Sequence, residues 1–237
     1  MFNLMKLEMK KIKIGGYIRS SFIIYVVLAA LLILIMSTQD NSAAQIEAEE
    51  KIKSLGEILD FTSILSKVTF IIFASVLLSR FVIDEFRSKT MNIMFMYPIN
   101  RKKIIISKLF FVFIFTFVNI ILSNIFVNAI FFIYNSFTHV QAITFDSKLL
   151  VNHSISVIIT AISASFISMI PLYFGMRKYS VPTTIVSSII VTCLLSSSFN
   201  GDMTLNDIII IPIVFSIVGI IIAYLAIINI EKVDMSN

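Results

Sequence analysis

The residues best suited to chemistry in this sequence form a charged cluster between two long apolar stretches. The cluster covers residues 84–108, and its charged members are Asp84, Glu85, Arg87, Lys89, Arg101, Lys102, Lys103 and Lys108. Between the two charged ends lies the largely apolar run 91–97, followed by Pro98. A solvated linker has no need of such a run, whereas a segment that fills a groove on another protein does. The pattern predicts a docking segment whose charged ends fix the register; an interfacial loop is the alternative interpretation.

Motifs for catalysis or metal binding are absent from the sequence. It contains no GxxxxGK[ST] phosphate loop, no HExxH motif and no Cys/His cluster with metal-ligand spacing. His139 and His153 have no evident partner, and the single Cys193 cannot form an internal disulfide. We therefore predict structural roles for both histidines. The chain is not expected to be an enzyme, and it is expected to bind no metal and no cofactor of its own.

The composition indicates a membrane protein. Of the 237 residues, 58% are hydrophobic and only 14% are charged, whereas a soluble domain carries about 25% charged residues. Several apolar runs reach or approach the ~20 residues that a helix needs to cross a bilayer. They are too long for the ~10-residue alternating strands of a membrane barrel. We predict an all-α integral membrane protein. The net charge of +5 does not indicate nucleic-acid binding, because the basic residues lie beside membrane spans.

Six transmembrane helices are expected in a single domain over residues 17–234, at residues 17–36, 61–83, 107–134, 149–174, 181–199 and 208–228. Residues 1–16 are basic and amphipathic, which predicts a helix in the headgroup plane that Gly15 and Gly16 end. Pro171 is expected to bend the end of the fourth span, and Pro212 and Gly219 to kink the sixth.

The distribution of basic residues predicts the orientation. Six spans place both termini on the same side as the charged cluster. On the other side lie only Lys51, Lys53, Lys67 and Lys148 of the 19 Lys and Arg residues. Because positive charge gathers in cytoplasmic loops, we place both termini and residues 84–103 in the cytoplasm. Lys67 is expected to extend its ammonium group to the outer interface.

Polar side chains inside the spans suggest a translocation path. The candidate residues are Asn119, Asn124, Thr184 and Ser188. The alternative, which the residues themselves favour, is that these groups join helices through hydrogen bonds. The acidic residues all lie outside the predicted spans or at their ends. This argues against an ion-coupled transporter, which usually carries an intramembrane carboxylate.

The charged cluster resembles the signature of ABC-2 type transporter permeases. The resemblance lies in Glu85, Arg87, Ser88, Lys89 and Thr90, the turn Tyr97–Arg101, and Lys108. It implies a permease that works with a separate ATPase subunit, which binds the ATP and Mg, and with a second permease, either another copy or a homologous chain. Residues 84–103 are then the coupling segment. The coupling residues that the resemblance implies are Glu85, Phe86, Arg87, Lys89, Thr90, Met94, Tyr97, Pro98 and Arg101.

By this resemblance the chain is expected to lie in the bacterial cell membrane as the permease subunit of an ABC exporter. It is similar to bacitracin- and lantibiotic-immunity permeases and to amphipathic-peptide exporters. The expected cargo is an amphipathic peptide, a peptide antibiotic or another hydrophobic compound, moved outward; no nucleic acid is involved. Only residues 196–207 join the last two spans, so the re-entrant segments frequent in the family look reduced. An ATP-independent channel or secondary transporter, and a non-transporting scaffold or sensor, remain the alternatives.

Overall fold

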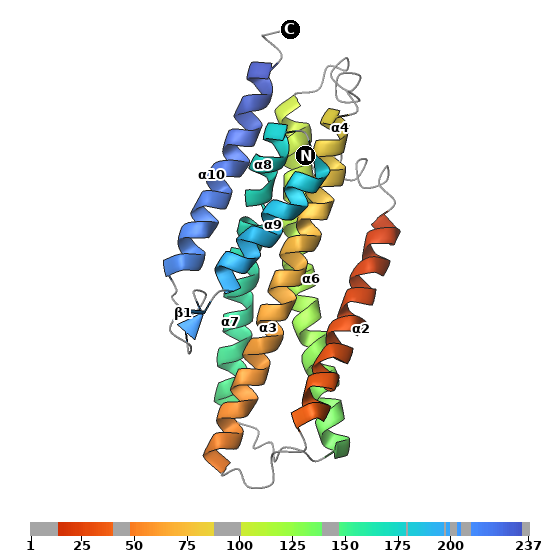
Figure 1. Cartoon of the computed structure of the whole chain (residues 1–237), viewed down its shortest axis with the longest axis vertical. Helices are drawn as coiled ribbons and strands as arrows, with labels where there is room; N and C mark the ends of the chain where they lie inside the picture. The colour runs from red at the N-terminus through yellow and green to blue at the C-terminus, as the bar shows by residue number, and fades with distance from the viewer. Residues whose placement is uncertain are drawn as a thin grey trace. The chain divides into compact units, whose positions relative to one another are not determined.

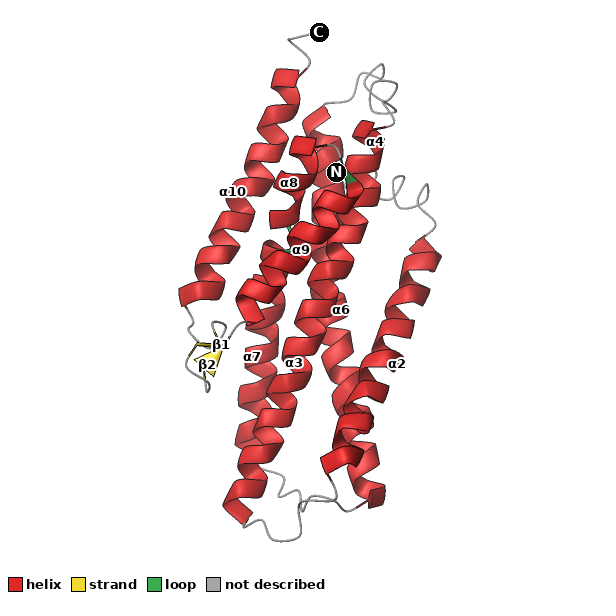
Figure 2. Ribbon diagram, viewed as in Figure 1, coloured by secondary structure: helices red, strands yellow, loops and turns green. Residues whose placement is uncertain are grey.

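Helices dominate the fold (Figures 1 and 2). The computed structural model describes residues 14–39, 48–87, 101–138, 147–178, 180–196, 198–199, 203–204 and 210–233. The helices are α2 (Ile14–Gln39), α3 (Ala48–Leu78), the π-helix η1 (Ser79–Ile83), α4 (Asp84–Arg87), α6 (Arg101–Thr138), α7 (Ser147–Ile167), α8 (Ile170–Lys178), α9 (Val181–Ser196) and α10 (Ile210–Val233). The predicted all-α class is confirmed.

One small hairpin lies between α9 and α10 (Figure 2). It consists of the two-residue strands β1 (Ser198–Phe199) and β2 (Met203–Thr204), which pair antiparallel. Ser198 lies opposite Thr204, and Phe199 opposite Met203. These strands occupy the short connection for which the sequence predicted reduced re-entrant segments. A hairpin pairs its own backbone groups locally, as short connections of this kind commonly do.

Among the residues that the structure describes, four helical segments are long and apolar enough to cross a membrane. They are Gly15–Ile35, Ile58–Arg87, Ile104–Phe137 and Leu150–Lys178. The apolar helices Val181–Ser196 and Pro212–Leu225 are shorter than the ~20 residues of a full crossing. Helix covers most of each predicted span, and a multi-pass membrane protein is confirmed. The predicted fifth span differs at its end, where α9 stops at Ser196 and Ser198–Phe199 form β1. The count of six spans and the cytoplasmic placement of the termini stay predictions.

The start of the first span differs from expectation. α2 begins at Ile14, so Gly15 and Gly16 are helical and do not end a preceding helix. Glycine costs about 1 kcal/mol relative to alanine in a helix. The two glycines are nevertheless helical, because backbone groups in lipid have no hydrogen-bond partners outside the helix. Residues 1–13, which hold most of the predicted interfacial helix, lie outside the described residues.

Pro171 interrupts the fourth span as the sequence predicted. α7 ends at Ile167 and α8 begins at Ile170. Proline has no N–H group, so Pro171 cannot donate to the carbonyl of Ile167. The backbone compensates with tighter bonds: the Met169 N–H donates to Phe166 O (3.0 Å) and the Leu172 N–H to Met169 O (3.1 Å).

α10 continues through the two residues that were expected to kink it. Pro212 lies in the first turn of α10, where a missing N–H group leaves no helical bond unmade. Gly219 permits close packing instead. A Cβ atom at Gly219 would lie 2.1 Å from the carbonyl oxygen of Phe166, so only glycine lets α10 approach the α7 backbone this closely.

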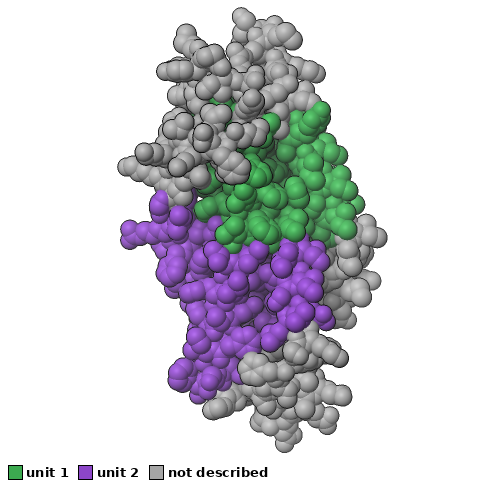
Figure 3. Space-filling model, turned by 180° about the vertical axis from the view of Figure 1, so that it is seen from behind, with its two compact units in different colours: residues 1–12, 68–118, 161–237 green, residues 13–67, 119–160 purple. Residues whose placement is uncertain are grey.

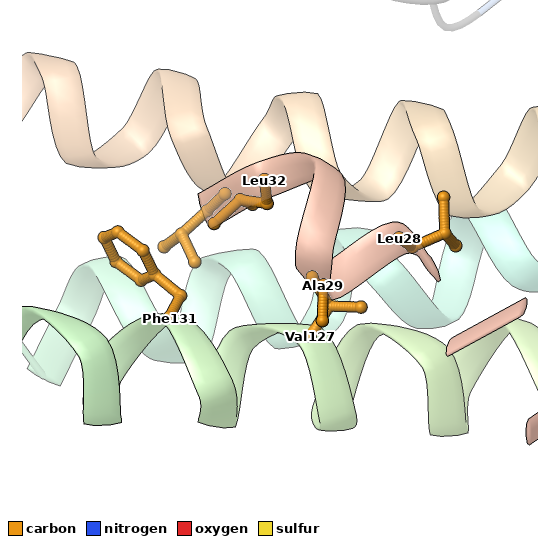
Figure 4. Packing of buried hydrophobic residues seen from close by; sticks show 6 residues of the cluster. Leu28, Ala29, Leu32, Val127 and Phe131 are labelled. Carbon is orange, nitrogen blue, oxygen red and sulfur yellow. The ribbon is translucent and has the colours of Figure 1, made fainter. Parts of the chain in front are cut away.

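The chain divides into two compact units (Figure 3). Unit 1 comprises residues 1–12, 68–118 and 161–237, and unit 2 comprises residues 13–67 and 119–160. In unit 1, η1 packs against α8 and α9, and α10 packs against α8. In unit 2, a buried apolar cluster joins α2, α3 and α6: Leu28, Ala29, Leu32, Leu59, Val127 and Phe131. Figure 4 shows Ala29 of α2 against Val127 of α6, with Leu32 turned toward Phe131.

We predict that Gly219→Ala destabilises the protein by about 1–3 kcal/mol, because the added methyl group overlaps backbone atoms that cannot move aside freely. The thermal unfolding midpoint of the purified protein in detergent measures the effect. Gly16→Ala is the matched control, since nothing lies within 4 Å of a Cβ atom at that position and alanine is the better helix former. Equal midpoints for the two variants would contradict the close packing of α10 on α7.

Candidate functional site

The described part of the predicted coupling segment is its two ends. α4 continues directly from η1 and carries Glu85, Phe86 and Arg87. Arg87 is exposed, while Glu85 and Phe86 are half-buried. Arg101 is the first residue of α6. The other predicted coupling residues lie outside the described residues: Lys89, Thr90, Met94, Tyr97 and Pro98.

A buried cation joins these two ends. Lys108 of α6 is only 2% exposed. Its ammonium group donates a hydrogen bond to the carbonyl oxygen of Phe81 (3.1 Å) and forms an ion pair with the carboxylate of Glu85, which is 22% exposed. A buried ammonium group without such acceptors is strongly unfavourable. The Lys108–Glu85 pair therefore ties the start of α6 to the end of the α3–η1–α4 run, across residues 88–100 of the predicted coupling segment.

The sequence contained a signal for this contact that went unused. Lys108 belongs to the charged cluster and to the residues that carry the family resemblance, but it is not among the coupling residues that the resemblance implies. It follows four residues of apolar or small type, Ile104–Ser107, inside a helix that enters the membrane. A cation so placed is rare and usually pairs with a carboxylate or a backbone carbonyl. Glu85, at the end of the preceding span, was the nearest carboxylate that topology places at the same membrane boundary.

Two of the predicted path residues, Thr184 and Ser188, lie on α9 in unit 1. Both are buried. The Ser188 hydroxyl lies 2.9 Å from the Ser75 hydroxyl of α3, and Thr184 donates to the carbonyl of Ser180 (3.1 Å). Thr184 also contacts α8 at Gly175, where a Cβ atom would come within 2.3 Å of its Oγ1. These hydroxyls thus lie at helix contacts, and their part in transport stays a prediction.

The other two, Asn119 and Asn124, belong to a polar seam in unit 2. We use this name for hydrogen-bonded or ion-paired side chains that join α2, α3, α6 and α7: Tyr25, Asp60, Thr62, Ser63, Ser66, Asn119, Ser123, Asn124, Asn128 and His153. Tyr25 donates to Asn119 Oδ1 (2.6 Å) and Ser63 to Asn124 Oδ1 (2.9 Å). Two further contacts link α3 to α6, Thr62 to Asn128 Oδ1 (3.0 Å) and Ser66 to Ser123 (3.0 Å).

His153 closes one end of the seam. Its Nε2 lies 3.5 Å from Asn128 Nδ2, and its Nδ1 lies 3.7 Å from Asp60 Oδ1. No partner for His153 is evident from the sequence, because its partners lie on α3 and α6, at least 25 residues away along the chain. His139 lies outside the described residues. Within the part of the chain that the structure describes, no three His, Cys, Asp or Glu side chains gather as a metal site.

Lys67 differs from its expected position. It is buried, with 3% of its surface exposed, rather than extended to an outer interface. Position 67 lies one turn after Ser63, whose hydroxyl bonds Asn124 of α6. Residues one turn apart share a helix face, so the lysine lies on the side of α3 that packs against neighbouring helices.

Comparisons with known proteins place these features in a family. A family model described as "ABC-2 family transporter protein" matches residues 4–196, a range that includes η1, α4, Lys108 and the polar seam. A Bacillus subtilis (strain 168) protein described as "Uncharacterized protein YcbO" is 33% identical over 234 residues. The match covers 98% of this chain and 99% of that protein. No solved structure matches the chain.

We predict that Lys108→Met lowers the free energy of unfolding by about 2–3 kcal/mol. The change leaves the Glu85 carboxylate and the Phe81 carbonyl without the ammonium group. The loss is smaller than for a fully buried pair because Glu85 retains contact with solvent. Thermal unfolding in detergent measures it.

The double variant Lys108→Met/Glu85→Gln is expected to recover part of that loss, since it removes the unpaired charge as well. Arg87→Ala, on the exposed face of α4, is the control and is expected to leave the unfolding midpoint unchanged. If the double variant were as unstable as the sum of its single variants, the ion pair would have no energetic role.

Proposed function

Because the chain belongs to the ABC-2 family of transporter proteins, we propose that it is the permease subunit of an ATP-driven exporter. It is a multi-pass cell-membrane protein and a membrane transport component. The sequence contains no phosphate-binding loop, so in this proposal a separate ATPase subunit binds ATP and Mg and hydrolyses the nucleotide. A second permease, identical or homologous, completes the exporter.

The single observation that carries the proposal is the Lys108–Glu85 pair at the base of residues 84–103. Glu85 continues into η1 and α3, and Lys108 lies on α6. A force applied by the ATPase to the segment between them would therefore reach two spanning helices together. Without the pair, the two helices could move apart at the base of the segment, and that movement would absorb the force. The tied base is what a coupling segment requires.

Further contacts extend from this base within unit 1. Ser75, one turn before η1, meets Ser188 of α9, and Ile83 meets α8 at Gly175. Hydroxyl pairs and close backbone contacts hold neighbouring helices at fixed spacing in lipid. In our proposal, movement of the coupling segment is passed through these contacts to α8 and α9.

The proposed cargo is an amphipathic peptide, a peptide antibiotic or another hydrophobic compound, moved outward.

The polar seam supports this proposal over an ion-coupled transporter. The seam hydroxyls and amides that we describe bond one another, which supports a structural role for them rather than ion coordination. Asp60, the one seam carboxylate, is largely exposed. Of the phenylalanines crowding the third span, Phe111 and Phe115 pack against each other and against Phe81 and Phe73. Phe110 is exposed, as suits lipid or an apolar cargo.

Arg87→Ala is predicted to weaken capture of the ATPase subunit about tenfold, which corresponds to ~1.4 kcal/mol. Arg87 is exposed at the end of α4, so its loss removes a contact to the partner without disturbing the core. The measurement is affinity purification of the tagged permease from its native membrane in mild detergent, with the ATPase quantified by mass spectrometry and by ATP hydrolysis.

Arg177→Ala is the matched control, because Arg177 is also exposed and ends α8, outside the coupling segment. It is expected to retain the ATPase. Recovery of the wild-type permease with no ABC ATPase would favour a non-transporting scaffold. Cargo transport that continued in cells depleted of ATP would favour a channel or secondary transporter.

A further inference from the structure

The π-helix η1 changes which side of the chain faces its neighbours. Arg80 is exposed, whereas Phe81, Val82 and Ile83 are buried, Ile83 completely. In a regular α-helix residue 83 would lie only about 60° from residue 80 around the axis, on the same exposed side. An i→i+5 turn holds one additional residue, and the Asp84 N–H donates to Ser79 O in this pattern. The additional residue turns Ile83 inward.

The inward position of Ile83 is matched by its surroundings. A Cβ atom at Gly175 would lie 2.2 Å from Ile83 Cδ1 and 2.3 Å from Thr184 Oγ1. The absence of a side chain at Gly175 therefore leaves the space that the Ile83 side chain occupies between α8 and α9. We call this space at Gly175 the seat of Ile83. The seat explains how the π turn is accommodated, but it does not fix the orientation of α4, which follows the turn.

Lys108 contacts both the π turn and the helix beyond it. Its ammonium group donates to the carbonyl of Phe81, in the middle of η1, and pairs with Glu85, in α4. These two acceptors come four residues apart, one on each side of the junction at Asp84. Their positions relative to one buried point charge depend on the register of the turn. A change from π to α geometry would rotate Glu85 by about 100° and move it about 1.5 Å along the axis.

We propose that Lys108 is a positioning residue that holds η1 in its π register. It thereby sets the rotation at which α4 and the coupling segment leave the membrane. Without the ammonium group the turn relaxes toward regular α-helix, and Ile83 leaves its seat for the exposed side. The consequence for an ATPase rests on the proposed function, but the register itself does not.

The test is cysteine labelling in a Cys193→Ser background, on detergent-purified protein that elutes as a single species. Ile83→Cys and Val82→Cys are each treated with a water-soluble maleimide, with Lys108 intact and with Lys108→Met. In a regular α-helix residue 82 lies about 200° from Arg80 and stays buried. We expect slow labelling at both positions when Lys108 is present. In Lys108→Met we expect labelling at position 83 to become at least about tenfold faster. Labelling at position 82 is expected to stay as slow as with Lys108 intact.

Two controls separate register from stability. Lys108→Arg, which keeps a buried cation, is expected to preserve protection at position 83. If Lys108→Met is not recovered folded, Lys108→Met/Glu85→Gln replaces it with the same expected pattern. Unchanged protection at position 83 would overturn the proposal, and so would faster labelling at both positions, which reports local unfolding. No ATPase is present, so either result leaves the exporter proposal to its own test.

Discussion

A buried ammonium group needs acceptors, and in this protein that need organises the helix ends at which the proposed coupling segment begins. Lys108 obtains its acceptors from Phe81 and Glu85, both on the preceding helical run. Because the cation and its acceptors flank residues 88–100, satisfying the charge also ties the two helices at the base of that segment. The same contact includes Phe81 of the π turn, and Ile83 of that turn packs at Gly175, where Thr184 also lies. One electrostatic requirement thus links the coupling segment to helix packing.

In unit 2 the side chains that need hydrogen-bond partners are mainly neutral. A hydroxyl or amide that faces lipid without a partner is unfavourable, so the seam hydroxyls of α3 find partners on α6. Each such bond contributes about 1 kcal/mol or less, and their value lies in fixing which faces of α3 and α6 meet. Around them the apolar cluster that includes Leu28, Leu59 and Phe131 fills the remaining space.

The sequence was informative where a property depends on one segment alone. Apolar length predicted a helix at each span, and Pro171 predicted the break between α7 and α8 because it lacks a donor. The sequence was not sufficient to predict a property that depends on the facing helix. The partners of His153, the close approach at Gly219 and the burial of Lys67 arise from neighbours distant in sequence. The π turn left no pattern of its own, since Ser79–Ile83, with Arg80 as its one charged residue, could equally continue an α-helix. Of the predicted coupling residues, only Glu85, Phe86 and Arg87 have described side chains.

The central claim is that an ATPase takes hold of this chain at residues 84–103. Site-specific photo-crosslinking tests it most directly, with a benzophenone amino acid placed at position 87 in the native membrane. We expect a covalent adduct between this chain and an ABC ATPase subunit, identified by mass spectrometry of the linked peptides. Adducts only to lipid or to proteins without a nucleotide-binding domain, from a protein that is inserted and folded, would contradict it.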